Sequence, residues 1–465
     1  MSAPRSYSVV GLGKLGASMA AAIASRGFPV IGVDINRQAV DALGEGRAPV
    51  AETGLEALVQ ANRERLRATT NHREAVLGSD LTFVIVPTPS DESGAFSLQY
   101  AAWAFGEIGE ALRDKIGYHL VVLTSTVLPG ATRHGLLPIL ERRSGKRCGA
   151  DFGLCYSPEF IALGSVIRDF LHPDFTLVGE VDDRSGRTLE CAYAAIMPDG
   201  PPCKRMSLEN AELAKVSVNA YVTTKITFAN MLADLCERIP GGDVDVVSDA
   251  LGQDARIGRR YLTGALGFGG PCFPRDNVAL AYLARALGTR AELPEATDRV
   301  NRSLASTVLE RVGLSVRHGT TVAVLGLAYK PSSHVIEESQ GIVLAKALSR
   351  HGARVVAHDP LASSMAAHEL KDHGLVLGSL EDCLAQAAVV VVTTPDPAYA
   401  ALSAADFRRD GGSVTVVDCW RLLAAALDGA PGITYLPIGR SVDDRANAAR
   451  LSRLWADGTA GRRWP

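Results

Sequence analysis

The stretch YSVVGLGKLGASMAAAIASRGFPVIGVD, residues 7–34, predicts a β-strand, a glycine turn, a helix of small residues and a second strand. Gly11, Gly13 and Gly16 have G-x-G-x-x-G spacing where a strand ends and a helix begins, the context that a dinucleotide-binding turn requires. The second glycine lets a pyrophosphate approach the backbone, and the helix N-terminus supplies N–H donors. Asp34 ends the second strand, where a carboxylate would bind ribose hydroxyls and repel a 2′-phosphate. The stretch therefore favours NAD over NADP; the alternative is an ordinary tight turn followed by a solvated aspartate.

Alternating strand and helix patterns continue beyond this stretch. Short β-branched runs occur at residues 81–89 (LTFVIVPTP), 119–127 (HLVVLTSTV) and 175–180 (FTLVGE), with helical segments between them. Such alternation indicates a parallel sheet with helices on both faces. The pattern returns near residue 320, where TTVAVLGLAYK, ARVVAHDP, AVVVVTTP and VTVVDCW each predict a buried strand that ends in a turn.

Residues 207–239, between these two regions, show helical periodicity without a glycine or a proline. This predicts one long helix, suited to join two domains and to offer a dimer surface. The expected fold is α/β, with two Rossmann-like, doubly wound parallel-sheet domains joined by a long central helix. We expect an N-terminal NAD-binding domain over residues 1–201, a central helical and dimerisation domain with a cysteine loop over residues 202–305, and a C-terminal Rossmann-like domain over residues 306–465.

Composition excludes several classes of protein. The chain has 465 residues, of which 47% are hydrophobic and 21% charged, and its formal net charge is −3. The chain has no long basic run, so neither a nucleic acid nor an anionic membrane is indicated as a partner. No apolar run reaches the length that spans a bilayer, and the N-terminus lacks the pattern of a signal peptide. The eight cysteines are scattered without a C-x-x-C pair, so we expect no metal site, reduced thiols and a cytoplasmic location.

The segment GFGGPCFPRD, residues 267–276, has a composition that no regular helix or strand would choose. Gly269 and Gly270 would let a ligand approach the backbone, and the neighbouring prolines fix the path of the loop. Arg275 would favour a thiolate at Cys272, whereas Asp276 would oppose it or orient a base. A single cysteine is often a buried apolar residue, so both a nucleophile and a structural thiol remain open.

The long helix carries Glu212, Lys215, Asn219 and Lys225. Lys215 and Asn219 are four residues apart and therefore project from one face of the helix. An ammonium beside an amide could stabilise an oxyanion or an alkoxide. The alternative is a solvated helix face without a chemical role.

These segments, in this order, resemble the UDP-glucose/GDP-mannose dehydrogenase family, and most of all its UDP-glucose 6-dehydrogenase branch. The resemblance spans nearly the whole chain and rests on GLGKLG, VPTP (86–89), TSTVLPG (124–130), SPEF (157–160), AELAKVSVNAY (211–221), RIGRRYL (256–262), GFGGPCFPRD and GLAYK (326–330). It implies oxidation of a sugar C6 alcohol to a carboxylate with two NAD+ and one water. It also implies that the Cys272 thiolate captures the intermediate aldehyde as a thiohemiacetal, which becomes a thioester.

The resemblance also implies roles for individual residues. It gives Lys215 and Asn219 to the oxyanion, Asp276 to a water or to acid/base steps, and Glu159 and Thr126 to placing the water and the reacting centre. Around the cofactor it places Gly11, Gly13, Gly16, Asp34, Thr88, Thr126 and Lys330, the last of which could instead reach the sugar. Around a UDP-sugar it places Glu159, Phe160, Ile161, Lys215, Asn219, Tyr261, Leu262, Gly269, Phe273 and Lys330, with the C-terminal domain binding the nucleotide sugar. Arg256 matches an arginine that reaches the neighbouring subunit's site, which implies a homodimer.

Several positions depart from the family pattern. Leu163 stands where many members have glutamate, Phe175 where they have arginine, and Thr263 where some have lysine. Arg275 replaces a lysine, and Glu337 replaces an arginine. The substrate therefore stays open between UDP-glucose, GDP-mannose, a UDP-N-acetylhexosamine and an unusual sugar nucleotide. A two-electron dehydrogenase or epimerase with a structural Cys272, and a non-catalytic nucleotide-binding protein, are the competing classes.

Overall fold

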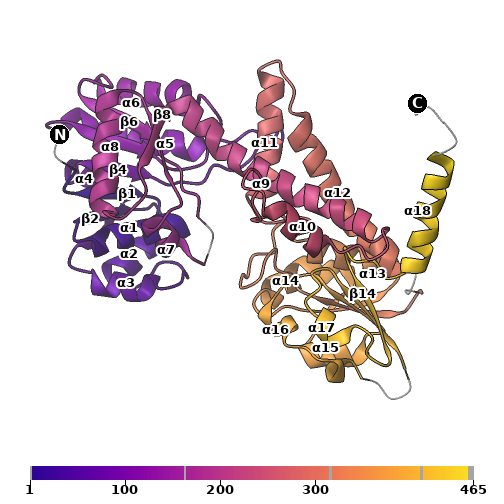
Figure 1. The fold of residues 1–465 in the computed structure, drawn as a ribbon. Helices are drawn as coiled ribbons and strands as arrows, with labels where there is room; N and C mark the ends of the chain where they lie inside the picture. Colours follow the sequence, from indigo (N-terminus) through magenta and orange to yellow (C-terminus); the bar gives the residue numbers. More distant parts are fainter. Residues whose placement is uncertain (1–2, 162–163, 314–316, 409–411, 459–465) are drawn as a thin grey trace. The chain divides into compact units, whose positions relative to one another are not determined.

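The computed structural model describes residues 3–161, 164–313, 317–408 and 412–458 (Figure 1). It divides into two compact units. The first comprises Met1–Val218 and Tyr282–Leu287, and the second comprises Asn219–Ala281 and Gly288–Pro465. Among the described residues, no helix combines the length and the apolar character that a membrane span requires.

An eight-stranded sheet forms the centre of the first unit, with the strand order β3-β2-β1-β4-β5-β6-β7-β8. Neighbouring strands are parallel except for β6 and β7, which pair antiparallel through Cys155–Glu180 and Tyr156–Gly179. This single reversal was not predicted from the sequence. The strands are β1 (Tyr7–Val10), β2 (Val30–Val33), β3 (Leu66–Thr69), β4 (Leu81–Val84), β5 (His119–Leu123), β6 (Phe152–Tyr156), β7 (Thr176–Glu180) and β8 (Cys203–Ser207).

Helices cover both faces of this sheet, because successive strand residues point to opposite sides. Val9 belongs to a buried cluster with α1 and α8, whereas its neighbour Val10 belongs to another cluster with α4, α5 and α6. The helical elements are α1 (Lys14–Ser25), α2 (Arg37–Gly44), α3 (Leu55–Ala61), α4 (His72–Leu77), α5 (Gln99–Asp114), the π-helical turn η1 (Ala131–Leu136), α6 (Leu137–Ser144), α7 (Val166–Leu171) and α8 (Asp183–Ile196).

The second unit contains a six-stranded, fully parallel sheet with the order β11-β10-β9-β12-β13-β14. Its two faces are again buried: Val322 and Val324 pack in a cluster with α13, and Ala323 and Leu325 pack in a cluster with α15. The strands are β9 (Thr321–Leu325), β10 (Arg354–His358), β11 (Val376–Leu377), β12 (Val389–Val392), β13 (Val414–Asp418) and β14 (Ile433–Pro437). The helices are α13 (Gln340–Arg350), α14 (Ser363–Leu370), η2 (Lys371–His373), α15 (Leu380–Gln386), α16 (Pro397–Ala400), η3 (Ala404–Phe407), α17 (Ala424–Leu427) and α18 (Asp444–Gly458).

The long central helix is α9, Leu208–Cys236, which lies within the predicted range of residues 207–239. It is followed by α10 (Val244–Gly252), α11 (Phe273–Ala286) and α12 (Glu292–Gly313). Two doubly wound α/β sheets and a long central helix confirm the predicted fold class. The domain boundaries at residues 201 and 305 stay predictions.

Candidate active site

The glycine turn between β1 and α1 is shaped by close backbone contacts. A Cβ on Gly11, whose φ is +97°, would lie 2.0 Å from the Ile85 carbonyl oxygen, and one on Gly16 would lie 1.8 Å from the Gly11 carbonyl oxygen. Neither position can carry a side chain. Gly13 differs, because a Cβ there would meet no described atom within 4 Å. The open space lies at the start of α1, where first-turn N–H groups have no partner within the helix, so the turn fits a dinucleotide pyrophosphate.

Asp34 directly follows β2 and lies beside this turn. Its carboxylate accepts hydrogen bonds from the backbone N–H of Leu12 at 2.6 Å and of Asn36 at 2.8 Å. The side chain is thereby held against the glycine turn and stays partly exposed. A carboxylate in this place fits the ribose hydroxyls of NAD.

The loops that follow β4 and β5 are joined into one edge. Thr88 donates from its hydroxyl to the Thr126 carbonyl oxygen at 2.7 Å. The Ser125 hydroxyl accepts from Val86 N at 2.8 Å and donates to Val86 O at 2.7 Å. Two residues predicted to lie near the cofactor, Thr88 and Thr126, are therefore neighbours at the carboxyl ends of adjacent strands, where ligands of parallel sheets bind.

Glu212 of α9 ties this edge to the long helix. Its fully buried carboxylate accepts from Gly130 N at 2.6 Å and from Thr132 N at 2.8 Å, at the start of η1. The sequence placed Glu212 on the long helix, but no role was predicted for it. In the structure it fixes the end of the TSTVLPG loop to the helix that carries Lys215.

Lys215 lies in a compact group with the predicted residues Glu159 and Phe160. Its ammonium donates to the Glu159 carbonyl oxygen at 2.6 Å and lies 4.5 Å from the centre of the Phe160 ring. Burial raises the pKa of the Glu159 carboxyl to about 7, although the nearby Lys215 ammonium works in the opposite direction. A carboxyl that titrates near neutral pH suits a proton acceptor.

Phe175 completes this group and explains one departure from the family pattern. Its ring lies 4.6 Å from the Phe160 ring, centre to centre, at an interplanar angle of 40°. An aromatic side chain here packs on Phe160, whereas an arginine would place a second cation near Lys215. Ile161 is partly buried against the adjacent core. Leu163 lies outside the described residues.

In the second unit, Asn219 and Asp276 form a direct pair. The Asn219 side-chain amide donates to the Asp276 carboxylate at 2.6 Å, and Asp276 is 1% exposed. Arg275 contacts the other carboxylate oxygen at 3.3 Å. Asp276 lies in the first turn of α11, and its backbone N–H donates to the Cys272 carbonyl oxygen at 2.9 Å.

Cys272 is the exposed residue that directly precedes α11. The backbone N–H groups at a helix N-terminus stabilise a thiolate, so the position suits a nucleophile. Gly269 and Gly270 before it have a packing reason as well: a Cβ would lie 2.4 Å from the Glu338 carbonyl oxygen and 2.6 Å from the Tyr329 ring, respectively.

The remaining predicted substrate residues in the second unit differ in exposure. Tyr261 is half exposed with a φ of +67°, and its ring meets that of Phe273 edge to face at 6.4 Å. The Leu262 side chain is buried. The Arg256 side chain is 88% exposed and pairs with Asp254. It projects from a loop whose carbonyl oxygens at residues 257 and 258 accept from the Lys225 ammonium.

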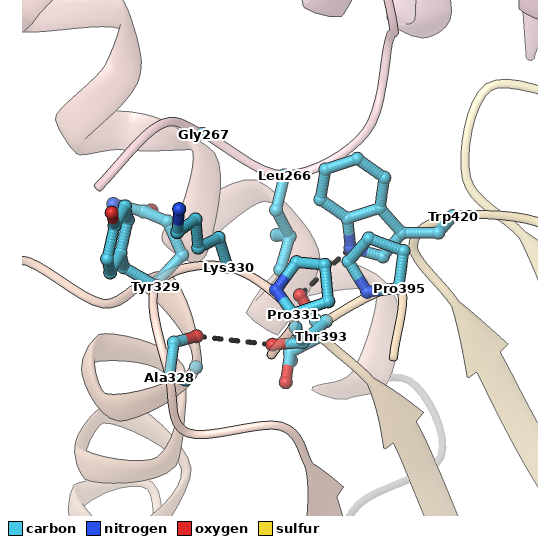
Figure 2. Close-up of a pocket in the computed structure, with 12 residues that line it drawn as sticks. Leu266, Gly267, Ala328, Tyr329, Lys330, Pro331, Thr393, Pro395 and Trp420 are labelled. Carbon is cyan, nitrogen blue, oxygen red and sulfur yellow. Dashed lines mark hydrogen bonds between the residues drawn. The ribbon is translucent and has the colours of Figure 1, made fainter. Parts of the chain in front are cut away.

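A cavity of ≈ 70 Å³ opens at the carboxyl ends of β9, β12 and β13 (Figure 2). Lys330, predicted near the cofactor or the sugar, lines it together with Gln340, Thr393, Trp420 and Gly267 of the cysteine loop. The Trp420 indole N–H donates to the Thr393 carbonyl oxygen at 2.9 Å, which fixes the ring at the rim. Sequence reasoning missed Gln340, Thr393 and Trp420; the last two lie at the ends of the runs AVVVVTTP and VTVVDCW, where a strand was predicted to end in a turn, and that position was the available signal.

Two other departures lie near this cavity or the cysteine loop. Glu337 is exposed, and its backbone carbonyl accepts from Gly270 N at 2.9 Å. Because the contact involves the backbone, it tolerates the change from arginine to glutamate. Nothing in the structure explains Thr263. No group of three or more His, Cys, Asp and Glu side chains in the described part of the chain is arranged to hold a metal ion.

Three family models match the chain in succession. They are the NAD binding domain of the UDP-glucose/GDP-mannose dehydrogenase family at residues 5–197, its central domain at 209–303 and its UDP binding domain at 323–425. The UDP-glucose 6-dehydrogenase AglM of Haloferax volcanii is 38% identical over 402 residues, covering 85% of this chain and 92% of that protein. The GDP-mannose 6-dehydrogenase of Pseudomonas putida is 34% identical over 410 residues, with the same two coverages of 85% and 92%. A solved UDP-glucose dehydrogenase structure from Pyrobaculum islandicum aligns with a TM-score of 0.83 at 34% identity, over 94% of this chain and 98% of that one.

Proposed function

The chain belongs to the UDP-glucose/GDP-mannose dehydrogenase family and is an NAD-dependent nucleotide-sugar 6-dehydrogenase, and on that premise we propose that its substrate is UDP-glucose and its product UDP-glucuronate. The observation that carries the proposed chemistry is the arrangement at the start of α11. An exposed Cys272 precedes the helix, and the buried Asp276 in its first turn is paired with Asn219. A thiol at the start of a helix, close in sequence to a buried, hydrogen-bonded carboxylate, suits covalent capture of an aldehyde.

The proposed reaction consists of two oxidations, a covalent capture between them and a final hydrolysis. NAD+, when bound, accepts a hydride from the substrate in each of two oxidations. In the first, the C6 alcohol loses a hydride and a proton to give an aldehyde. The Cys272 sulfur then bonds to the aldehyde carbon, and the carbonyl oxygen takes up a proton as the thiohemiacetal. Loss of a second hydride and that proton gives a thioester. Water adds to the thioester, the carbon–sulfur bond breaks, and the carboxylate product and the Cys272 thiolate form with release of two protons.

Individual side chains have proposed roles in these steps. Lys215 and Asn219 stabilise the charge that develops on oxygen, because both present N–H donors from α9. Asp276 holds the attacking water or moves a proton. Glu159 accepts a proton near neutral pH because burial raises its pKa to about 7. Thr126 places the reacting centre, and Lys330 binds the nucleotide sugar from the edge of the second sheet.

Support for UDP-glucose over GDP-mannose comes from similarity. The UDP-glucose dehydrogenase relative is more similar in sequence, and the cysteine loop GFGGPCFPRD resembles that branch. GDP-mannose is the second candidate, because a GDP-mannose dehydrogenase is 34% identical over an equal share of the chain.

The quaternary proposal is a homodimer. The α9 helix presents Tyr221, Phe228, Met231 and Leu235 as large exposed hydrophobic side chains. Their spacing of seven, three and four residues places them along one stripe of the helix. We propose that a second copy covers this stripe and, separately, that Arg256 reaches the partner's site, as the resemblance implies.

The cellular location we propose is the cytoplasm. None of the eight cysteines forms a disulfide in the described structure, as is usual in a reducing compartment.

The test of the proposed function is a screen of NADH release with UDP-glucose, UDP-galactose, UDP-GlcNAc, UDP-ManNAc and GDP-mannose. We expect the highest kcat/KM with UDP-glucose, two NADH per sugar and a carboxylate product. A higher kcat/KM with GDP-mannose would replace the substrate while keeping the chemistry. One NADH per sugar, with an aldehyde or ketone as product, would overturn the four-electron reaction and make Cys272 structural.

A further inference from the structure

We propose that two buried asparagines, Asn230 of α9 and Asn301 of α12, form a clamp that positions the Cys272 nucleophile. Both side chains bind the backbone of residues 265–268, the segment that leads into the cysteine loop. They act through the loop backbone and are therefore positioning residues. The inference rests on the proposed function, because it concerns the group that forms the covalent bond.

Asn301 binds both polar backbone groups of a single residue. Its Oδ1 accepts from Phe268 N at 2.8 Å, and its Nδ2 donates to Phe268 O at 2.9 Å. Asn301 is 4% exposed, so these bonds are shielded from water. A Cβ on Gly267 would lie 2.3 Å from Asn301 Oδ1, which means that the clamp closes on a residue without a side chain. The carboxamide therefore determines both the orientation and the depth of the Phe268 peptide.

Asn230 holds Ala265 and Leu266, at the start of the segment, in a similar way. Its Oδ1 accepts from Ala265 N at 2.8 Å, and its Nδ2 donates to Leu266 O at 3.3 Å. Asn230 is 3% exposed. The segment is thus attached by side chains to two separate helices, with four backbone groups engaged over four residues. An irregular loop gains from its neighbours the hydrogen bonds that a strand would obtain from a sheet.

The segment of residues 329–340 supports the loop further along. Gly270 N donates to the Glu337 carbonyl oxygen at 2.9 Å, and the Gln340 side chain contacts Phe268 O at 3.4 Å. The Tyr329 ring lies so close to Gly270 that a Cβ there would be 2.6 Å from it. Gln340 and Gly267 also line the cavity at the edge of the second sheet (Figure 2). The backbone before Cys272 is therefore held by hydrogen bonds at Ala265, Leu266, Phe268 and Gly270.

A displacement of Phe268 would be transmitted to Cys272, because the chain between them is short and constrained. Three residues separate the two, and they span at most about 10 Å when extended. Gly270 is fixed by its hydrogen bond and a φ of +84°, and Pro271 has a restricted φ. Cys272 is itself bound to Asp276 N through its carbonyl oxygen. Loss of the Asn301 bonds would consequently move the thiol relative to the N–H groups of α11.

The experiment compares Asn301→Ala and Asn301→Asp with Asn447→Ala in the full-length protein. Asn447 is also a buried asparagine of the second unit, 3% exposed, and its Nδ2 donates to Glu237 O at 2.8 Å and to Ser441 Oγ at 2.9 Å. Its side-chain hydrogen bonds in the described structure go to Glu237, Ser441 and Arg450, outside the cysteine loop, so it controls for the loss of stability that follows from removing a buried amide. The measured quantities are kcat, KM and the rate of Cys272 alkylation by iodoacetamide between pH 6 and 10. The tryptic peptide of residues 261–275 reports this alkylation without interference, because Cys272 is its one cysteine.

For Asn301→Ala we expect kcat to fall about 100-fold with KM within about twofold, the cost of a nucleophile displaced by roughly 1 Å. The alkylation profile should move to higher pH by at least about half a unit, because the thiolate loses helix N–H donors. Asn301→Asp keeps the acceptor for Phe268 N and removes the donor to Phe268 O, so its effects should be intermediate. Asn447→Ala should lower the urea midpoint and leave both kcat and the alkylation profile unchanged.

If the Asn301 variants match Asn447→Ala in kcat and in the alkylation profile, the asparagine serves stability alone and the clamp is wrong. Should Asn301→Ala fail to fold, Asn301→Asp carries the same comparison. Failure of the proposed function would look different. Full activity in Cys272→Ser would show that Cys272 is not the nucleophile. The alkylation profile of the Asn301 variants would still report the position of the loop.

Discussion

The side-chain amide of Asn219 donates a hydrogen bond of 2.6 Å to the carboxylate of Asp276, which is almost fully buried at the first turn of α11. A buried carboxylate needs such hydrogen-bond donors to offset its loss of water and to hold its orientation. The pair joins α9, which carries the proposed oxyanion donors, to α11, which begins beside Cys272. The two side chains therefore work as a unit.

Removing either member of this pair should cost most of what removing both costs. We expect Asn219→Ala and Asp276→Asn each to lower kcat about 100-fold or more, the usual cost of losing one aligned donor or base. The double variant should then be less than about tenfold worse than the poorer single variant, because both substitutions break the same interaction. Steady-state kcat for all four proteins gives the coupling. Losses that multiply would show that the two side chains act independently.

Glu159 should give the reaction an ascending limb near neutral pH. Burial raises the pKa of its carboxyl from 4.5 to about 7, so it becomes an effective proton acceptor as the pH rises through that value. Glu159→Gln should lower kcat about 100-fold or more and remove the inflection near pH 7. The measurement is kcat from pH 5.5 to 9, with thioester on Cys272 followed by mass spectrometry of quenched samples. An unchanged inflection in the Gln variant would assign it to another group.

Arg256 should act across the dimer interface. Its side chain is 88% exposed and pairs with the nearby Asp254, so the subunit that carries it leaves it accessible to a partner. We expect Arg256→Ala and Cys272→Ala to be inactive alone. After subunit exchange in an equal mixture, about a quarter of the sites combine an intact cysteine with an intact arginine from the neighbour, so about a quarter of the activity should return.

The comparison for this experiment is Arg290, another arginine with an 86% exposed side chain, which pairs with Glu292. Arg290→Ala should keep kcat within about twofold. Mixtures of Arg256→Ala and Cys272→Ala that gain no activity, although heterodimers are detected, would place Arg256 in its own subunit's site.

The sequence predicted those parts of the molecule that depend on local pattern. The G-x-G-x-x-G pattern predicted a tight turn, and Gly11 and Gly16 stand where a Cβ would clash with the backbone, whereas Gly13 leaves open space. The long helix was predicted because more than thirty residues lack a breaker. The central strands of both sheets, such as β1, β4, β5, β9 and β12, were predicted because parallel strands, buried on both faces, are continuous apolar runs. The outer strands β3, β8, β11 and β14 were not predicted.

Contacts between distant segments could not be read in this way. Phe160 and Phe175 are fifteen residues apart on irregular chain, and no period links them. Asn301 has the sequence appearance of a solvated helix residue, although its carboxamide is buried on Phe268. The antiparallel pairing of β7 also depends on where the chain returns to the sheet and not on the composition of the strand. Tertiary packing decides such features.

His119, the first residue of β5, should make the first unit sensitive to acid. It is fully buried: Nδ1 lies 3.0 Å from the Ser79 carbonyl oxygen and Nε2 lies 2.8 Å from the Thr82 hydroxyl. Nδ1–H therefore donates to Ser79, and Nε2 accepts from Thr82. Burial lowers the pKa of His119 to about 3; Lys115 works in the same direction, and Asp80 in the opposite one.

The sign of the effect follows from the two protonation states. Above pH 6.5 His119 is neutral in both the folded and the unfolded chain and adds no pH dependence. Below pH 6.5 the unfolded chain binds a proton that the folded chain refuses, so the free energy of unfolding falls by about 1.4 kcal/mol per pH unit, or about 2 kcal/mol by pH 5. His119→Gln should be less stable at pH 7.5. Between pH 6.5 and 5 its free energy of unfolding should fall less steeply than that of the unsubstituted protein, by about 1.4 kcal/mol per pH unit. Urea unfolding at pH 7.5 and pH 5 measures it, with the exposed His318→Gln as a control for the replacement of a histidine by glutamine. An equal slope in the His119 variant and in the unsubstituted protein would mean that water reaches the imidazole in the folded state.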